Sequence, residues 1–165
     1  MKELREDANG VRYFETGDTV RVQYPPAGEE KGTPPLFTIM GRTSVDIIKS
    51  NGYKLSALEI EAMMLLHDDL FYEVAVVGVK HEVKGEEVVA VVALQQGAAQ
   101  ARGIEYDSRT NTYESDQINT ELREIVSNVL APYKLPRRFI CVPKIPRNDT
   151  GKVNKVALKL ALNLQ

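Results

Sequence analysis

Two short runs of almost uninterrupted β-branched and small apolar residues constrain the fold of this chain more than any other feature. They occupy residues 74–79 and 88–94. Each run is far shorter than the roughly 18 apolar residues of a membrane-spanning helix, and neither alternates with polar residues. Runs of this length and composition are typical of strands that are buried on both faces of a sheet. The sequence therefore predicts a sheet with these two strands in its core.

Three further segments carry apolar residues at the spacing of an amphipathic helix. The apolar positions are Leu58, Ala62, Leu65 and Leu66 in the first segment, Ile118, Leu122, Ile125 and Val129 in the second, and Val153, Val156, Ala157 and Leu160 in the third. Residues at these intervals lie on one face of a helix, which predicts that this face is buried. The first helix is expected to open at the capping-box sequence of residues 56–59. The second is expected to end near Pro132, because proline disfavours helix at the residue before it.

The remaining segments predict short strands and loops. The Asn51-Gly52 pair between two apolar runs is a strong hairpin signal, because both residue types tolerate positive φ. Residues 13–24, 36–41 and 138–142 are predicted strands, whereas the proline-rich residues 25–35 and the polar residues 95–115 are predicted surface loops. Strands and helices alternate irregularly, so the predicted fold class is α+β, a small sheet with flanking helices preceded by a short β-hairpin.

The composition argues against several classes of function. A net charge of −2 lacks the positive excess that non-specific binding to nucleic acid requires. No apolar run is long enough for a membrane span. Two histidines without cysteine partners make a poor zinc site, and no metal site is predicted. Cys141 is the only cysteine, so no intramolecular disulfide can form. This suits the cytoplasm or an organelle matrix, the mitochondrial matrix included, without deciding between them.

Three clusters of polar residues carry the candidate chemistry. The first is a Thr-Gly-Asp sequence ending at Asp18, whose carboxylate could accept hydrogen bonds from ribose hydroxyls. The second, residues 41–54, is a cationic, glycine-containing turn suited to phosphates. The third, residues 145–152, puts a glycine before Lys152, so that backbone and ammonium can both approach a phosphate. It lacks the first glycine and the Ser or Thr of a P-loop. Taken singly, each cluster is more often a turn, a hairpin with solvated cations or a surface loop.

In this order and at these separations, the clusters resemble the C-terminal third of adenylate-forming enzymes. That superfamily includes acyl-CoA synthetases, luciferases and nonribosomal-peptide adenylation domains. The matching segments are Thr-Gly-Asp at 16–18, Gly-Arg, Asp-Ile-Ile-Lys, Gly-Tyr-Lys and Glu-Ile-Glu between 41 and 61, Val-Ala-Val-Val-Gly-Val at 74–79, Ala-Pro-Tyr-Lys-Leu-Pro at 131–136 and Pro-Arg-Asn-Asp-Thr-Gly-Lys at 146–152. Together they span nearly the whole chain, and so many motifs in register do not arise readily by chance.

The resemblance implies roles for individual residues in the adenylation step. Asp18 matches the acid that binds the ribose hydroxyls of ATP, and Arg42 matches an arginine that contacts the same nucleotide. Lys152 matches the catalytic lysine that reaches the α-phosphate and the carboxylate of the acid.

The resemblance also implies roles in thioester formation. Lys49 matches a position near the adenylate in the thioester-forming state, and Lys54 matches one that reaches toward the nucleotide phosphates. Asn51 and Gly52 match the turn that lines the pantetheine tunnel of coenzyme A.

The sequence departs from the family pattern between Arg42 and Asp46. The family usually has two residues there, and this chain has three. The family's hinge position consequently falls on Ser44 or Val45. The longer turn and the residues around it look most like those of the eukaryotic malonyl-CoA synthetase branch.

The resemblance implies that these 165 residues end a larger acid–CoA ligase. Residues 1–42 would close its N-terminal adenylation domain, residues 43–46 would form the hinge, and residues 47–165 would be a mobile lid. The substrates implied are a small carboxylic acid, ATP and coenzyme A, with Mg²⁺ bound alongside ATP mainly by the N-terminal domain. The lid would rotate between the two half-reactions. Without the phosphate loop and acyl pocket of that domain, the chain alone is expected to be inactive.

Two other functions remain open at this level. The chain could be the lid of an adenylation domain that loads a carrier protein, which a downstream carrier domain with a serine attachment site would favour. It could also be a non-catalytic binding module of the same fold. Loss of the lysine at position 152 would favour that hypothesis, and the lysine is present.

Overall fold

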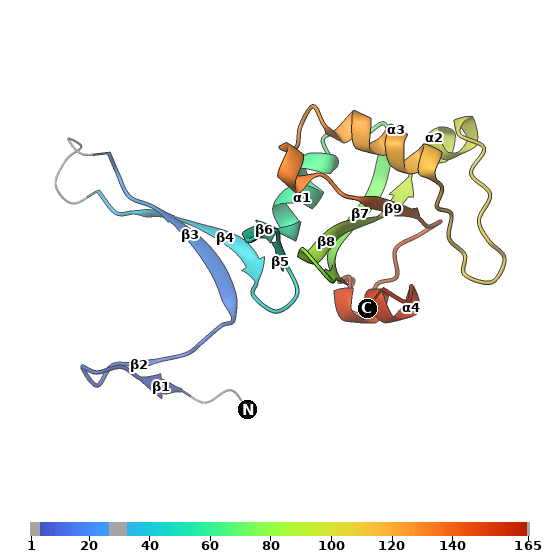
Figure 1. The fold of residues 1–165 in the computed structure, drawn as a ribbon. Coiled ribbons are helices and arrows are strands. Elements are labelled where there is room, and N and C mark those ends of the chain that lie inside the picture. Colours follow the sequence, from blue (N-terminus) through green and yellow to red (C-terminus); the bar gives the residue numbers. More distant parts are fainter. Residues whose placement is uncertain (1–3, 27–32, 165) are drawn as a thin grey trace.

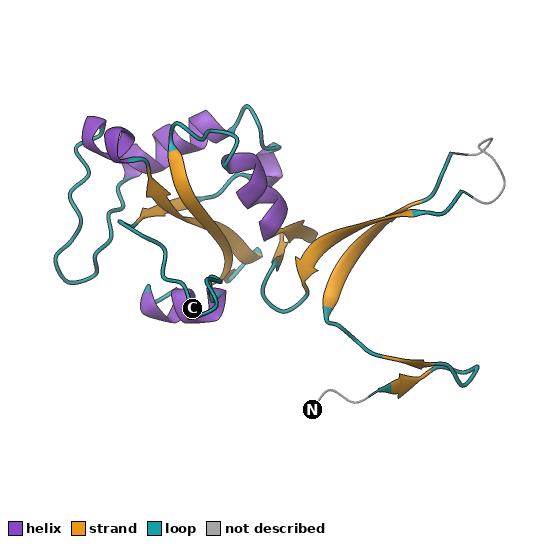
Figure 2. Cartoon of the chain, turned by 180° about the vertical axis from the view of Figure 1, so that it is seen from behind, coloured by secondary structure: helices purple, strands orange, loops and turns teal. Residues whose placement is uncertain are grey.

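The computed structural model describes residues 4–26 and 33–164 (Figure 1). Two hairpins come first. β1 (Arg5–Glu6) pairs with β2 (Arg12–Tyr13), and β3 (Asp18–Gln23) pairs with β4 (Leu36–Arg42). Both project from a body formed by the rest of the chain, as Figures 1 and 2 show from opposite sides. The loop predicted at 25–35 falls mainly on residues 27–32, which lie outside the described residues.

The body is built around one five-stranded sheet. Its strands are β5 (Ile47–Ser50), β6 (Tyr53–Ser56), β7 (Phe71–His81), β8 (Gly85–Leu94) and β9 (Arg138–Cys141). The order is β6-β5-β8-β7, and β9 also pairs with β8. The pairing of β8 with β9 is parallel, and the other pairings are antiparallel. Because β8 pairs with three strands, it organises the sheet.

Helices cover both faces of the sheet. α1 (Ala57–Met64), α2 (Gln96–Ala101) and α3 (Asp116–Val126) pack on one face, and α4 (Lys155–Ala161) packs on the other. A short 3₁₀ turn, Pro132–Lys134, precedes β9. Side chains of β7 and β8 alternate between the two apolar clusters: Val76, Ala90 and Val92 join the first, and Val77, Val89 and Val91 join the second. The predicted doubly buried strands and the α+β fold class are therefore confirmed.

The predicted buried faces of two helices are wrong. α1 buries Ala57, Ile60 and Met64, whereas Leu58, Leu65 and Leu66 are exposed. α4 buries Leu158, whereas Val156 and Leu160 are exposed. Each helix carries apolar residues on more than one side, so spacing alone does not select the buried one. Packing against the sheet selects the buried side.

Three predicted boundaries also differ from the structure. The run 13–24 is broken between β2 and β3, where Gly17 has φ +81°. The stretch 95–115 contains α2, whose Ala98 and Ala99 pack against the first apolar cluster. α3 ends at Val126, several residues before Pro132, and the Ser127 hydroxyl donates to the carbonyl oxygen of Glu124 at this end. Short polar or small residues thus end or begin elements where apolar periodicity gives no signal.

Candidate functional site

Asp18 and Arg42 meet at the base of the β3–β4 hairpin. The strand register pairs them, and Arg42 Nε lies 3.9 Å from Asp18 Oδ1. The Thr43 N–H donates to the Gly17 carbonyl at 2.9 Å, and the Thr19 and Thr43 hydroxyls are 2.8 Å apart. Both charged side chains stay accessible to solvent. The hairpin therefore presents a carboxylate and a guanidinium together, and the predicted contacts of Asp18 with ribose hydroxyls and of Arg42 with the same nucleotide stay predictions.

The chain turns sharply between Arg42 and Asp46. The Asp46 N–H donates to the Arg42 carbonyl at 2.8 Å, so the extra residue is absorbed in a tight turn. Ser44 is exposed and Val45 is half-buried. A Cβ at Gly41, which has φ +116°, would lie 2.5 Å from the Asp46 Cβ, so only glycine fits beside this turn. The assignment of Ser44 or Val45 as the hinge stays a prediction.

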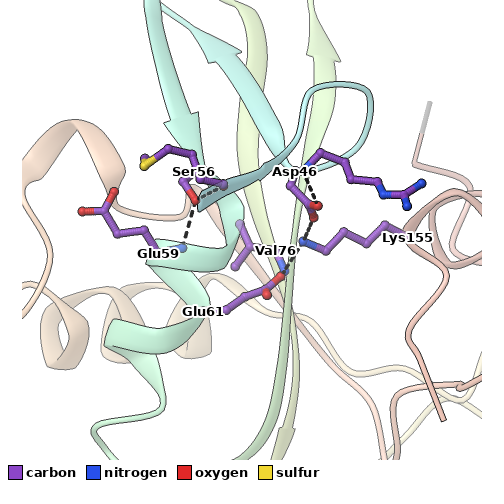
Figure 3. Close-up of polar contacts among 8 residues, drawn as sticks. Asp46, Ser56, Glu59, Glu61, Val76 and Lys155 are labelled. Atoms are coloured by element: carbon purple, nitrogen blue, oxygen red, sulfur yellow. Dashed lines mark hydrogen bonds and ion pairs between the residues drawn. The ribbon is translucent and has the colours of Figure 1, made fainter. Parts of the chain in front are cut away.

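A buried ion cluster lies directly behind the turn (Figure 3). The Lys155 ammonium is 2.7 Å from Asp46 Oδ1 and 2.8 Å from Glu61 Oε1, and the Val76 N–H donates to the same Glu61 oxygen at 2.7 Å. The three charged side chains are only 10–15% exposed. Burial raises the pKa of Glu61 above its ordinary value, although the Lys155 ammonium and the Val76 N–H act in the opposite direction. One ammonium is thus shared by two carboxylates.

Side chains of this region also contact the strand on the other side of the turn. The second Asp46 oxygen, Oδ2, accepts the Arg42 N–H at 2.9 Å. The Ser56 hydroxyl donates to the Met40 carbonyl at 2.6 Å and accepts the Glu59 N–H at 3.1 Å, which caps α1 as the sequence predicts. Figure 3 shows the Asp46 and Ser56 side chains with these contacts as dashed lines. Asp46 and Ser56 therefore connect β4 to the sheet and helix that follow it.

The turn between β5 and β6 confirms the hairpin predicted at Asn51-Gly52. Asn51 has φ +49° and Gly52 has φ +81°, the combination that a type I′ turn requires. Lys49 and Lys54 pair across the hairpin, and both are exposed. The Asn51 N–H donates to the Lys84 carbonyl at 3.0 Å, which docks this turn on the turn between β7 and β8.

We expect Gly52→Ala to destabilise the chain by about 1–2 kcal/mol, because an alanine is strained at this φ. No atom lies within 4 Å of the Cβ that would be added, so backbone strain is the only cost. Gly97→Ala is the matched control, since its Cβ also meets open space but the backbone is helical. That variant is expected to be neutral or slightly stabilising. Urea unfolding followed by circular dichroism measures both, and equal stabilities would refute the strain.

The loop of residues 145–152 is braced by Glu73 of β7. Arg147 Nε and Nη2 donate to Glu73 Oε1 at 2.9 and 2.7 Å, and the Ile145 N–H donates to Glu73 Oε2 at 3.0 Å. Arg147 Nη1 also donates to the Gly151 carbonyl at 2.9 Å. Lys152 follows at once and is exposed, and its ammonium has no hydrogen-bond or ion-pair partner in the part of the chain that the structure describes. A fixed backbone thus carries a lysine that is available to a ligand.

The lysine loop and the Asn51-Gly52 turn contact opposite ends of the β7–β8 ribbon. Glu73, which braces the loop, is near the beginning of β7, and Lys84, which holds the turn, follows its end. Eight residue steps separate Glu73 from His81, the last residue of β7. At about 3.3 Å per residue, the two contact points are roughly 25 Å apart.

Sequence reasoning assigned no role to three residues that shape this region, Glu73, Arg147 and Lys155, although Arg147 lies in the motif at 146–152. Glu73 has a usable signal, because it is a carboxylate at the edge of an apolar strand and needs a partner when buried. Lys155 shows no such signal, because its two carboxylate partners are 109 and 94 positions away in the sequence.

The sequence of this region matches a known family of protein domains. A model of the AMP-binding enzyme C-terminal domain matches residues 59–152, more than half of the chain. The chain belongs to this family. The match contains α1 from its third residue, Glu59, the whole β7–β8 ribbon and the lysine loop up to Lys152.

Relatives of this AMP-binding C-terminal domain include enzymes named as malonate–CoA ligases. The mitochondrial malonate–CoA ligase of Bos taurus is 41% identical over 143 residues, which cover 87% of this chain and 20% of that protein. The malonate–CoA ligase of Arabidopsis thaliana is 40% identical over 153 residues, covering 93% and 22%. The chain therefore spans about a fifth of the length of these relatives.

Solved structures give the same result for the fold. The domain superposes on ATP-bound MatB from Rhodopseudomonas palustris with a TM-score of 0.63 and 28% identity, over 94% of this chain and 25% of that one. Within the described residues, no helix is long and apolar enough to cross a membrane, and no group of three or more His, Cys, Asp or Glu side chains could hold a metal ion.

Proposed function

We propose that this domain is the mobile lid of an AMP-forming acid–CoA ligase that activates malonate. In the first half-reaction the acid and ATP form an acyl adenylate and pyrophosphate. In the second, the thiol of coenzyme A attacks the adenylate, and AMP leaves. The observation that carries the proposal is the 40–41% identity to malonate–CoA ligases over most of this chain.

Lys152 is the residue to which we assign catalysis of adenylation. A carboxylate and the α-phosphate of ATP are both negative, so their approach is opposed by charge. An ammonium held between them stabilises the charge that develops in the transition state. The braced loop and the unpartnered ammonium of Lys152 among the described residues support this role. Asp18 and Arg42 would hold the ribose and phosphates of ATP, which enters as its Mg²⁺ complex.

The second half-reaction is assigned to the β5–β6 hairpin. Asn51 and Gly52 would line the pantetheine path, with Lys49 near the adenylate and Lys54 near its phosphate. The lysine loop and this turn contact opposite ends of β7, so one orientation of the lid could hardly bring both to the same substrate atom. Rotation about Ser44 or Val45 would exchange them.

The surface of the β3–β4 hairpin supports the boundary proposed after residue 42. Val20 pairs with Ile39 and Val22 pairs with Phe37, so these side chains share one face of the hairpin. All four are exposed in this chain. An apolar face of this kind needs a cover, and the N-terminal adenylation domain implied by the length of the relatives would supply it. Residues 1–42 would then belong to that domain and residues 47–165 to the lid.

The test is pyrophosphate exchange by the complete enzyme with malonate, acetate and octanoate. We expect exchange to be fastest with malonate, and acyl-CoA to form when coenzyme A is added. The isolated chain should form no acyl-CoA from any of the three acids. Preference for another acid would refute malonate as the substrate but keep the ligase function, and acyl-CoA formation by the isolated chain would refute the division into domains.

Import of the complete enzyme into mitochondria is likewise proposed, because the relative from Bos taurus is named as mitochondrial.

Transfer to a carrier protein is the alternative acceptor reaction. The same enzyme preparation distinguishes the two acceptors. Acyl transfer to free coenzyme A supports the ligase, whereas adenylation with no transfer to coenzyme A favours a carrier-loading enzyme.

A further inference from the structure

The carboxylate of Asp46 joins the two sides of the proposed hinge. Its Oδ2 accepts the backbone N–H of Arg42, the last residue of β4, at 2.9 Å. Its Oδ1 accepts from the ammonium of Lys155, the first residue of α4, at 2.7 Å. Each oxygen thus serves one side, and the two contacts form a continuous polar link from the hairpin to the far face of the lid (Figure 3).

Lys155 connects that link to the catalytic loop. It lies three positions after Lys152 and directly follows Asn154, the N-cap of α4, whose side chain accepts the Ala157 N–H. Further along the helix, the Lys159 ammonium donates to the Gly78 carbonyl at 2.6 Å. The end of the lysine loop is therefore fixed by the cluster on one side and by the Glu73–Arg147 contacts on the other.

We propose that Asp46 is a positioning residue for adenylation, which holds the hinge turn and α4 in the relative arrangement that presents Lys152 to ATP. The inference rests on the proposed ligase function and extends it to a residue outside the substrate site. Loss of the link leaves the lid folded but lets its orientation and the Lys152 loop drift. Adenylation then slows, while thioester formation, which uses the Asn51-Gly52 turn, does not.

Asp46→Asn breaks the link with the smallest change in shape. An asparagine side chain has one acceptor oxygen, and its NH₂ group is a donor. Both partners of Asp46 are donors, so the amide can satisfy either the Arg42 N–H or the Lys155 ammonium but not both. Lys155→Gln breaks the same link from the other end and leaves Asp46 bonded to Arg42. Because the glutamine NH₂ can still donate to Glu61, this variant leaves less uncompensated charge than a methionine would, and it keeps the inference testable if Asp46→Asn does not fold.

Glu61→Gln is the matched control. It removes one negative charge from beside the same ammonium, as Asp46→Asn does. The Lys155 ammonium and the Val76 N–H both contact the same Glu61 oxygen, Oε1, so a glutamine carbonyl can keep both contacts. The control thus alters the charge of the cluster without touching the hinge side.

The experiment measures the two half-reactions separately in the complete enzyme. Pyrophosphate exchange reports adenylation, and transfer from a preformed acyl adenylate to coenzyme A reports the second step. We expect Asp46→Asn and Lys155→Gln to lower exchange by about 10- to 100-fold, the effect of a misplacement on the order of 1 Å, with transfer changed less than about twofold. Glu61→Gln should leave the ratio of the two rates unchanged.

The outcomes separate this inference from the function on which it rests. If the wild-type enzyme catalyses pyrophosphate exchange with none of the three acids, the proposed function is overturned. Active wild type with a parallel fall of both half-reactions in Asp46→Asn, or with no change in either, would leave Asp46 a structural residue only and overturn the inference. A change of the ratio in Glu61→Gln as large as in Asp46→Asn would do the same.

Discussion

Lys152→Ala in the complete enzyme is expected to lower adenylation at least about a hundredfold, because it removes the ammonium that we place between carboxylate and α-phosphate. Loss of one preorganised donor of this kind costs on the order of 3 kcal/mol of transition-state stabilisation. Transfer from a preformed acyl adenylate to coenzyme A should stay close to wild type, since that step is assigned to the β5–β6 hairpin. Pyrophosphate exchange and single-turnover transfer measure the two effects.

Lys144→Ala is the matched control for this prediction. Lys144 is an exposed lysine in the same segment, on the other side of the Arg147–Glu73 contacts. Its loss changes the net charge by the same amount but keeps the Lys152 ammonium, so pyrophosphate exchange should remain near the wild-type rate. Equal exchange by Lys152→Ala and wild type would refute the phosphate role of the loop, and the binding-module hypothesis would then be preferred.

Local chemistry made parts of this fold predictable from the sequence. The Asn51-Gly52 hairpin needs two adjacent residues with positive φ, and few other residue pairs meet that requirement. Residues 74–79 and 88–94 could be predicted as strands because their apolar character is continuous and both faces are buried. The Ser56 cap follows from the same local reasoning, because its hydroxyl satisfies a free N–H of α1.

Tertiary contacts decided the features that the sequence did not predict. The buried side of α1 could have been that of Leu58 or that of Ile60, and its packing against β7 selected Ile60. No sequence pattern distinguishes Lys155 from the other lysines, and only the fold brings it between Asp46 and Glu61. The spacing of apolar residues describes one segment at a time, so it does not reveal which side chains from distant segments form ion pairs.

The candidate site also combines residues that the sequence predicts with contacts that it does not. Asp18, Arg42 and Lys152 were assigned by resemblance to a family, and the structure brings the first two together at one hairpin base. It attaches the loop of Lys152 to Glu73, which no motif includes. The catalytic roles of all three remain proposals, whereas the contacts that position them are properties of the fold.

Lys155→Met is expected to destabilise the isolated chain by about 3–5 kcal/mol, the largest loss of stability that we predict for a single side chain. Methionine fills a similar volume but leaves Asp46 and Glu61 facing each other without a cation. Both carboxylates are largely buried, so water does not replace the lost ammonium effectively. Urea unfolding at neutral pH followed by circular dichroism measures the change.

Lys159→Met separates this electrostatic cost from the loss of a buried lysine stem. Lys159 lies one turn along α4, and its ammonium donates to the Gly78 carbonyl rather than to a carboxylate. Its replacement removes one hydrogen bond and strands no charge, so the expected cost is about 1–2 kcal/mol. Lowering the pH should narrow the gap between the two variants, because Glu61, whose pKa is raised by burial, then takes up a proton and its repulsion of Asp46 in Lys155→Met is removed. Equal losses at neutral pH would mean that the cluster stabilises the fold by packing alone.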